Sequence, residues 1–435
     1  MISKRLLKVL LLLCFLLLTA WGCSNTESLP APIPTAFIQP RPTITPSLTA
    51  TTVPTVTPTP TPNYCPRDTI PANLLDNSSE IDSSKLITFT AGMNGSEDLY
   101  VMNLDGSNRT NITNSQYSER FPIWSPDGKK IAFLSNRNDP AKPGSCLNMI
   151  SNNCVFEIFT SNSNGKHMTQ IGHGWNYYPH WSPDSNRVAY SLYFPSPNAT
   201  PDPNGNRQYL ADIYVVNLDG SHRTNLTSKF QPGEFNNPIW SPDSTKLAFV
   251  SHTGIVVVNS DGTNPTEYNI PDVRSVLFWS KDNRSILFMN KNYQIIKSNL
   301  DFTDLQILRI AFISPDNDIK FSPNGKWFAY KHSYNSTEKN IFCRQIRIAS
   351  VETFQTYFVY DEQDIATAAG DYFKPIANAI GISSFDWLGN SKLLFSQLAN
   401  HSVIFTPIED LFVIDVNGKG LRYITGDVSS FSLQP

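Results

Sequence analysis

The chain has 435 residues, with 34 basic and 37 acidic side chains and a net charge of −3. This balance provides no basic patch for nucleic acid and no acidic tail, so we expect no DNA or RNA partner. Aromatic residues make up 12% of the chain, including 26 Phe and 17 Tyr, which suits strand-rich packing.

Residues 1–22 predict an export signal, because three basic residues among the first eight precede an apolar run at 9–20. The run is too short for a confident membrane-spanning helix. It ends in Leu-Thr-Ala-Trp-Gly-Cys at 18–23, which resembles a bacterial lipoprotein lipobox, although Trp21 departs from the usual small residue. The resemblance implies cleavage before Cys23 and lipid attachment to its thiol. An ordinary signal peptide and an uncleaved anchor are the alternatives, and all three export the chain.

Residues 24–63 are rich in Pro and Thr, as in PTITPSLTATTVPTVTPTPTPN at 42–63. Such a composition cannot bury a core and favours an extended, disordered chain with polyproline character. At about 3 Å per residue, this stalk could hold a domain up to ~100 Å from a membrane. A lead-in segment at 64–84 follows. We therefore expect a lipid-anchored protein of the cell membrane or envelope that faces outward from the cytoplasmic membrane.

A stretch of about 15 residues then recurs along the chain. It reads FPIWSPDGKKIAFLS at 121–135, YPHWSPDSNRVAYSLY at 178–193 and NPIWSPDSTKLAFVSH at 237–252, with weaker copies at 276–291, 319–333 and 384–397. Two apolar runs flank a turn in which Pro presets φ and Gly closes the turn. The apolar alternation after the turn is typical of a strand. Each copy therefore predicts a β-hairpin.

A third strand and a short fourth strand follow each hairpin. The third reads DLYVMNLDG at 98–106 and DIYVVNLDG at 212–220, with related segments at 157–165, 254–262, 294–301, 345–352 and 410–418. Its Asn-Leu-Asp-Gly end is a strong tight-turn signal. The fourth is best seen in RTNIT at 109–113, RTNLT at 223–227 and RYIT at 422–425. Four antiparallel strands in roughly 40 to 65 residues describe one blade of a β-propeller.

These motifs resemble the TolB-like propeller repeat, a relative of the WD-type repeat, from about residue 85 to 435. The resemblance implies that the strand with Pro-x-Trp is innermost in each blade. Six complete hairpins are centred on Trp124, Trp181, Trp240, Trp279, Phe321 and Trp387.

The two ends of the repeat region supply the rest of one more blade. KLITFTAG at 85–92 is a second strand without a first, and VSSFSLQP at 428–435 is a first strand without a second, with Phe431 in the Trp position. Joined, they close the ring. The sequence therefore predicts an all-β, seven-bladed propeller over 85–435. A miscounted copy in the degenerate 301–379 region would instead give six or eight blades.

Four of the six cysteines lie beyond the signal and Cys23. Cys146 and Cys154 lie in one loop, and we expect them to form a disulfide, as suits an exported chain. That pairing leaves Cys65 for Cys343, which would join the lead-in segment to the propeller. The sequence leaves this connectivity open, and the lack of CxxC spacing disfavours a metal site.

The repeated residues predict structural roles. A Trp at one place in every blade indicates packing between blades rather than ligand binding. The turn Asp residues lack the ligand spacing of an EF-hand and should close their turns. The motifs G-x-S-x-G, HExxH, Walker A and the dinucleotide fingerprint are absent. We expect no cofactor and no metal, although His180, His252 and His332 leave open a His-bound metal, as in similar propellers of pectin-degrading lyases.

Strand alternation would place the SPDG and NLDG turns on one face, and the longer connections on the other. Insertions on that second face occupy 136–156, 194–211, 331–342, 361–382 and 398–409. Long loops on a rigid scaffold usually carry binding, although tolerated insertions are the alternative. Connectors beside the inner strands supply candidates for a binding rim that combine charged and aromatic side chains: Glu119, Arg120, Trp175, Tyr177, Tyr178, Glu234, Phe235, Arg274, Tyr372 and Lys374.

The sequence thus predicts a monomeric, membrane-anchored propeller that binds a protein, peptide or glycan outside the membrane without catalysis. The TolB-like resemblance implies an interaction scaffold, although a fold alone does not decide function. The alternative is a carbohydrate-active lyase or hydrolase with its site at the channel mouth. Three or more converging His or carboxylate side chains there would favour the enzyme.

Overall fold

The computed structural model describes residues 85–93, 96–139, 155–196, 209–231, 233, 235–308, 319–336, 341–353, 355–361, 382–398, 409–415, 421–428 and 430–434. All of them lie in one compact unit, residues 58–435. Every regular element in this described part is a β-strand. It accordingly contains no helix long and apolar enough to span a membrane.

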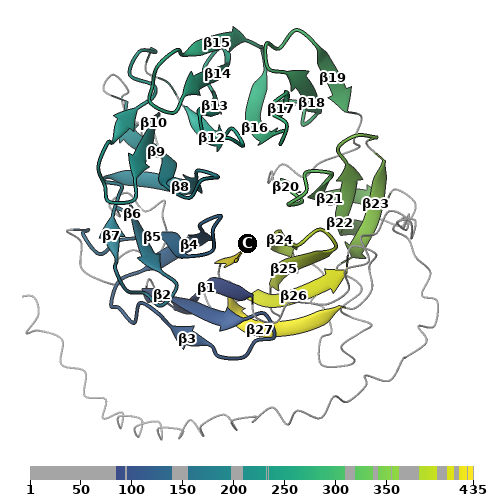
Figure 1. Cartoon of the computed structure of the whole chain (residues 1–435). Helices are drawn as coiled ribbons and strands as arrows, with labels where there is room; N and C mark the ends of the chain where they lie inside the picture. The colour runs from purple at the N-terminus through teal and green to yellow at the C-terminus, as the bar shows by residue number, and fades with distance from the viewer. Residues whose placement is uncertain are drawn as a thin grey trace, which may run out of the picture. The chain divides into compact units, whose positions relative to one another are not determined.

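The strands form seven four-stranded antiparallel sheets, arranged as blades around a central channel (Figure 1). From the channel outward, blade 1 contains β28 (Ser430–Leu433), β1 (Leu86–Met93), β2 (Ser96–Asn103) and β3 (Thr110–Asn111). Blade 2 contains β4 (Glu119–Trp124), β5 (Lys130–Ser135), β6 (Glu157–Asn162) and β7 (Thr169–Gln170). Blade 3 contains β8 (Trp175–Trp181), β9 (Arg187–Pro195), β10 (Tyr209–Asn217) and β11 (Thr224–Asn225).

The remaining four blades follow in chain order. Blade 4 contains β12 (Asn236–Trp240), β13 (Lys246–Val250), β14 (Gly254–Asn259) and β15 (Thr266–Asn269). Blade 5 contains β16 (Val273–Trp279), β17 (Ser285–Asn290), β18 (Ile295–Asn299) and β19 (Leu305–Leu308). Blade 6 contains β20 (Ile319–Phe321), β21 (Trp327–Ser336), β22 (Ile341–Ser350) and β23 (Thr356–Asp361). Blade 7 contains β24 (Ile382–Leu388), β25 (Lys392–Leu398), β26 (Glu409–Asp415) and β27 (Arg422–Val428). The predicted seven-bladed, all-β propeller is confirmed.

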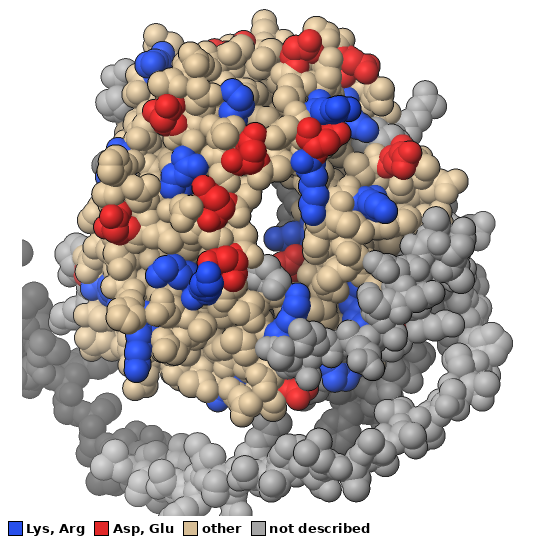
Figure 2. Space-filling model, in the orientation of Figure 1, with Lys and Arg blue, Asp and Glu red and all other residues tan. Residues whose placement is uncertain are grey.

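The core lies between neighbouring blades. Alternating side chains on the two faces of each sheet bury themselves against the next sheet, as Ile213, Trp240 and Phe249 do between blades 3 and 4. Figure 2 shows that this packing leaves the channel open at its centre, with charged side chains around its mouth.

Three of the repeated Trp residues join their blade to the preceding one through a hydrogen bond. The indole N–H of Trp181 donates to the carbonyl of Ile123 at 3.1 Å, and that of Trp387 donates to the carbonyl of Lys320 at 2.7 Å. Trp240 repeats this arrangement between blades 4 and 3. In each case the acceptor belongs to the inner strand of the preceding blade, directly before its own Trp or Phe. The predicted packing role of these residues is confirmed.

The hairpin turns are also bonded to one another. The fourth residue of the turn has a positive φ in blades 2 to 6, as in Gly128 (68°), Ser185 (61°) and Ser244 (62°). The Ser185 hydroxyl accepts from the Asp127 N–H, and the Ser244 hydroxyl accepts from the Asp184 N–H, both at 3.0 Å. Within a turn, Ser241 donates to Asp243 at 2.6 Å, and this bond lowers the pKa of Asp243 to about 2. The expected turn-closing role of the Asp residues is confirmed.

Blade 1 closes the ring with one strand from each end of the propeller. β28 pairs antiparallel with β1, as predicted. However, the residue in the Trp position is Leu433 and not Phe431. Leu433 opposes Ile87, just as Trp124 opposes Ile131, whereas Phe431 opposes Phe89. The prediction for Phe431 was wrong because it followed aromatic character, whereas Gln-Pro at 434–435 corresponds to the Ser-Pro that follows Trp124, Trp181 and Trp240.

Candidate functional site

Strand direction separates short turns from long connections, as expected. In blade 2 the turns at 125–128 and 163–166 lie at one end of the antiparallel sheet. The β5–β6 connection and the connector to blade 3 lie at the other end, which we call the loop face. The five predicted insertions all start from this face. Much of them (140–154, 197–208, 337–340, 362–381 and 399–408) lies outside the described residues, so the site is built from their bases.

A β-bulge in the inner strand aims the first charged residues of β4. Arg120 opposes Leu134, but Ile123 opposes Ala132, so one extra residue is accommodated between them. Pro122 suits this position because it has no N–H for the ladder. Similar register shifts precede the Trp in β8 and β12. Because a bulge re-aims side chains, Glu119 and Arg120 point into the framework of blades 1 and 2.

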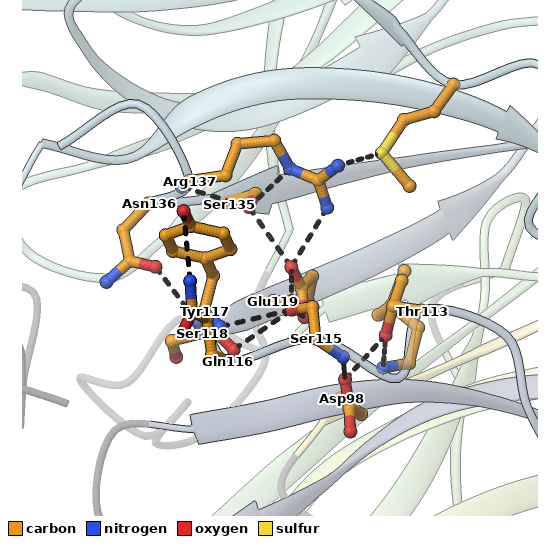
Figure 3. Close-up of polar contacts among 12 residues, drawn as sticks. Asp98, Thr113, Ser115, Gln116, Tyr117, Ser118, Glu119, Ser135, Asn136 and Arg137 are labelled. Atoms are coloured by element: carbon orange, nitrogen blue, oxygen red, sulfur yellow. Dashed lines mark hydrogen bonds and ion pairs between the residues drawn. The ribbon is translucent and has the colours of Figure 1, made fainter. Parts of the chain in front are cut away.

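Glu119 is the centre of a buried polar cluster (Figure 3). Its side chain is 0% exposed, and Arg137 Nη2 lies 3.0 Å from its Oε1. The Ser115 hydroxyl is 3.0 Å from both carboxylate oxygens, and the Ser135 hydroxyl is 3.2 Å from Oε1. Burial raises the pKa of Glu119 to about 7, against the opposing effects of Arg137 and Ser115; the nearby Asp98 acts in the same direction as burial.

Asp98 of β2 fixes the connector that carries Ser115. It accepts from the Ser115 N–H at 2.8 Å, the Thr113 hydroxyl at 2.9 Å and the Asn111 amide at 2.8 Å. Blade 3 repeats this corner, where Asp212 accepts from the Thr227 hydroxyl and the Asn225 amide. The repeated T-N-x-T motif is therefore a structural corner that holds the connector between blades.

A second buried ion pair lies beside the first and joins blades 1 and 2. Arg120 binds Glu97 of β2 through two bonds, with Nε at 2.8 Å and Nη2 at 3.0 Å from the two carboxylate oxygens. The Ser118 hydroxyl also donates to Glu97, and the Arg120 guanidinium lies 5.2 Å from the centre of the Phe156 ring. Paired bonds of this kind give both strength and a fixed orientation.

Four consecutive residues, 136–139, form the stem of the loop at 140–154. Asn136 Oδ1 accepts from the Ser118 N–H at 2.8 Å, and Arg137 binds Glu119 and the Ser135 hydroxyl. Asn138 donates to Glu157 of β6 at 2.7 Å. Asp139 accepts from the Val155 N–H at 2.6 Å and thereby joins the two ends of the loop. Each stem residue is thus held by a different partner. The stem was not predicted from sequence, although Asn-Arg-Asn-Asp directly after an apolar strand is an available signal.

The structure distributes the predicted rim residues differently from expectation. Glu119 and Arg120 lie inside the framework, and Phe235 is 2% exposed with its ring edge-on to Phe249. Arg274 is exposed, and its guanidinium lies 4.9 Å from the centre of the Tyr293 ring. Only the backbone of Trp175, Tyr177 and Tyr178 is described, within β8, and Glu234, Tyr372 and Lys374 lie outside the described residues.

The predicted lipid and disulfide sites fall almost entirely outside the described part of the chain. Cys23, Cys65, Cys146 and Cys154 are not among the described residues, and of Cys343 only the backbone in β22 is described. Lipid attachment and both disulfides therefore stay predictions.

The channel wall carries His180 on the inner strand β8, as predicted. Burial, together with the charge of Lys320, lowers the pKa of His180 to about 4, so this imidazole is neutral at physiological pH. Across the described residues, no three His, Cys, Asp or Glu side chains gather as a metal site. The described residues therefore provide no set of metal ligands that would support the alternative of a carbohydrate-active enzyme.

Comparison with known proteins finds similarity to TolB proteins. No protein-family model matches the chain. A TolB homologue of Chlorobium luteolum is 29% identical over 165 residues, covering 38% of this chain and 31% of that protein. TolB of Acinetobacter baumannii aligns with 81% of this chain and 67% of its own at 14% identity and a TM-score of 0.45.

A peptidase carries the same propeller architecture. The acylaminoacyl peptidase of Pyrococcus horikoshii aligns with 78% of this chain and 50% of its own, at 14% identity and a TM-score of 0.50. The chain spans less than half the length of the first curated relatives that it matches. With its Pro-x-Trp hairpins, interlocked turns and two-ended closing blade, the described part of the chain is a TolB-like seven-bladed β-propeller.

Proposed function

We propose that the protein is an exported propeller, lipid-anchored at Cys23, whose loop face binds a protein, peptide or glycan outside the membrane without catalysing a reaction. The observation that carries this proposal is the stem at 136–139, where four consecutive side chains are held by four different partners. The loop at 140–154 therefore starts from a fixed base, and loops on a rigid scaffold are where binding usually resides.

The contrast between the two faces supports the same choice. On the turn face, hydroxyl and amide groups bond neighbouring turns to one another, as Ser185 and Ser244 do. Those groups are already occupied, and the turns of blades 2 to 4 share Ser-Pro-Asp and differ only in their fourth residue. On the loop face the chain departs from its repeat. There the buried ion pairs fix the base of the loop, so a ligand bound at this face would cost less conformational entropy.

Similarity to the named TolB proteins supports a scaffold that works by binding. The peptidase relatives favour catalysis less, because the matched regions cover only about half of the archaeal enzyme and 30% of the peptidase YuxL of Bacillus subtilis. The propeller is the part that this chain shares with them.

Loop replacement tests the binding role. The full chain and a variant in which 140–154 is replaced by a Gly/Ser linker of equal length would be used to capture envelope proteins and cell-wall glycans, with the ligand identified by mass spectrometry. A matched control, Lys281→Ala with Arg284→Ala on the turn face, should retain the ligand that the loop variant loses. Equal capture by all three proteins would count against the loop face.

Processing tests the anchor. We expect the wild-type protein to fractionate with membranes after globomycin-sensitive cleavage, and Cys23→Ser to be released or left unprocessed. A wild-type protein that is correctly cleaved and soluble would contradict lipid attachment.

A further inference from the structure

We propose that Glu119 and Arg137 form a proton-controlled catch at the base of the 140–154 loop. In this proposal, ionised Glu119 holds Arg137 and the stem, whereas a proton on Glu119 releases Arg137. The inference rests on the proposed function in one respect, because a looser stem would alter binding at the loop face.

The geometry provides two arrangements for the same groups. Ser115 and Ser135 bond to Glu119 through hydroxyls, which can rotate and accept as well as donate. The cluster can therefore accommodate a protonated Glu119 without leaving a buried polar atom unbonded. Arg137 cannot lose its own charge. Its side chain is 22% exposed, so the guanidinium can turn to water when the opposing charge disappears.

Arg137 has no second carboxylate among its described contacts. Its guanidinium lies over the rings of Phe159 at 4.7 Å and Phe133 at 5.9 Å, and it contacts the Met168 sulfur and the Ser135 hydroxyl. These contacts orient the side chain without neutralising its charge. The ion pair with Glu119 is the contact that depends on protonation.

The other charged groups nearby have partners of their own. Asp98 of β2 accepts from the connector to blade 2. Glu97 of β2 accepts from Arg120 of β4. Glu157 of β6 accepts from Asn138 and Gln170. His173 Nδ1 lies 3.9 Å from Glu157 Oε1. Asp139 accepts a hydrogen bond from the Val155 N–H. Glu119 is therefore the acid whose protonation most directly affects Arg137.

Linkage fixes the direction of the effect. Burial raises the pKa of Glu119 to about 7, and Arg137 opposes that rise. Because coupling between two groups is reciprocal, ionisation of Glu119 must favour docking of Arg137 by the same free energy. Departure of Arg137 with Glu119 still buried would raise the pKa of Glu119 further. Docking therefore weakens as the pH falls from that higher pKa to about 7, and is weakest below pH 7.

Hydrogen exchange measured by mass spectrometry on the full chain tests this catch, from about pH 5.5 to about pH 8.5, with rates corrected for intrinsic exchange. The informative amides are Asn136, which donates to Ser118 O, Asp139, which donates to Asn136 O, and Val155. We expect their protection in the wild type to fall several-fold between about pH 8.5 and about pH 5.5, while amides of β13 stay constant.

Two variants separate the catch from general loosening. Glu119→Gln and Arg137→Gln should each show low, pH-independent protection of the stem. Glu97→Gln removes the neighbouring acid and should retain the pH dependence. Stem protection that is independent of pH in the wild type would overturn the proposal, as would pH dependence that survives in Glu119→Gln. These readouts need no ligand, so failure of the loop-replacement test leaves them unaffected.

Discussion

The indole N–H of Trp240 donates to the main-chain carbonyl of His180, 2.9 Å away in the preceding blade. Trp181 and Trp387 make the same bond to the blades before them, whereas the indole nitrogens of Trp124 and Trp279 are buried without a hydrogen-bond partner. One repeated residue type therefore occurs in two states, bonded and unbonded, at the same place in the blade. That difference allows the contribution of the inter-blade bond to be measured.

Trp240→Phe should destabilise the propeller more than Trp279→Phe does, by about 1–3 kcal/mol, because only the first substitution leaves a part-buried carbonyl without this donor. Both substitutions remove similar ring area, so Trp279→Phe is the matched control. Urea unfolding of the two variants checks the difference. Equal losses would mean that the bond contributes nothing beyond packing.

Ser244→Ala should cost about 1–2 kcal/mol, because it removes the acceptor of the Asp184 N–H and keeps a side chain at a φ of 62°. Ser244→Gly loses the same bond but relieves the left-handed strain, which is worth roughly 1 kcal/mol. The Gly variant should therefore be the more stable of the two in thermal denaturation. The opposite order would contradict a strained turn.

Gln434→Ala should weaken closure of the ring. The Gln434 side chain accepts from the Leu86 N–H at 3.2 Å and donates to the Gly128 carbonyl at 2.8 Å, so it joins β1, β28 and the first hairpin turn. Loss of two such bonds predicts about 1–2 kcal/mol of destabilisation. Gln306→Ala, on the exposed strand β19, serves as control. Thermal unfolding and limited proteolysis near the C-terminus should separate the two variants.

Stability should depend on pH through Glu119. The pKa of about 7 in the folded protein exceeds the ordinary value of 4.5. Stability from this group is therefore fully present below pH 4.5 and is lost as pH rises through 7. The change is on the order of 3 kcal/mol. The stability of Glu119→Gln relative to the wild type should rise by that order between pH 4.5 and 8. A constant difference would show that Glu119 titrates normally.

The pH dependence of global unfolding and the pH dependence of stem protection concern two different transitions. Global unfolding exposes Glu119 to water, whereas release of the catch moves only Arg137 and leaves Glu119 buried. A fall in pH therefore favours the folded propeller through Glu119 and at the same time weakens the stem. Global unfolding experiments and stem exchange should respond in opposite directions.

Repetition made the fold predictable from sequence. The Pro-x-Trp hairpins, the turns with Asp and the split closing blade each follow from patterns within about ten residues. The misplacement of Phe431 arose because the closing strand is a single divergent copy. Only its pairing with Ile87 and Phe89 fixes the register.

The site was less predictable because its partners are distant in sequence. Glu119 and Arg120 follow a connector, and at that position charged residues commonly lie on the surface. Their burial depends on Glu97, which lies 23 residues before Arg120, and on Arg137, which lies 18 residues after Glu119. Local pattern reveals that a residue is charged, but not whether a later strand will bring it a counter-ion.

Ring closure also has a consequence for how the molecule is made. The Thr90 hydroxyl meets the Ser430 hydroxyl at 2.7 Å across 340 residues of chain. Until β28 has been synthesised, β1 has no inner neighbour, and the main-chain N–H of Trp124 lacks the Ser432 hydroxyl that accepts from it. Contacts of such long range form slowly and leave strand edges open to wrong partners. Pairing of β28 with β1 is therefore the step that makes the other blades a ring.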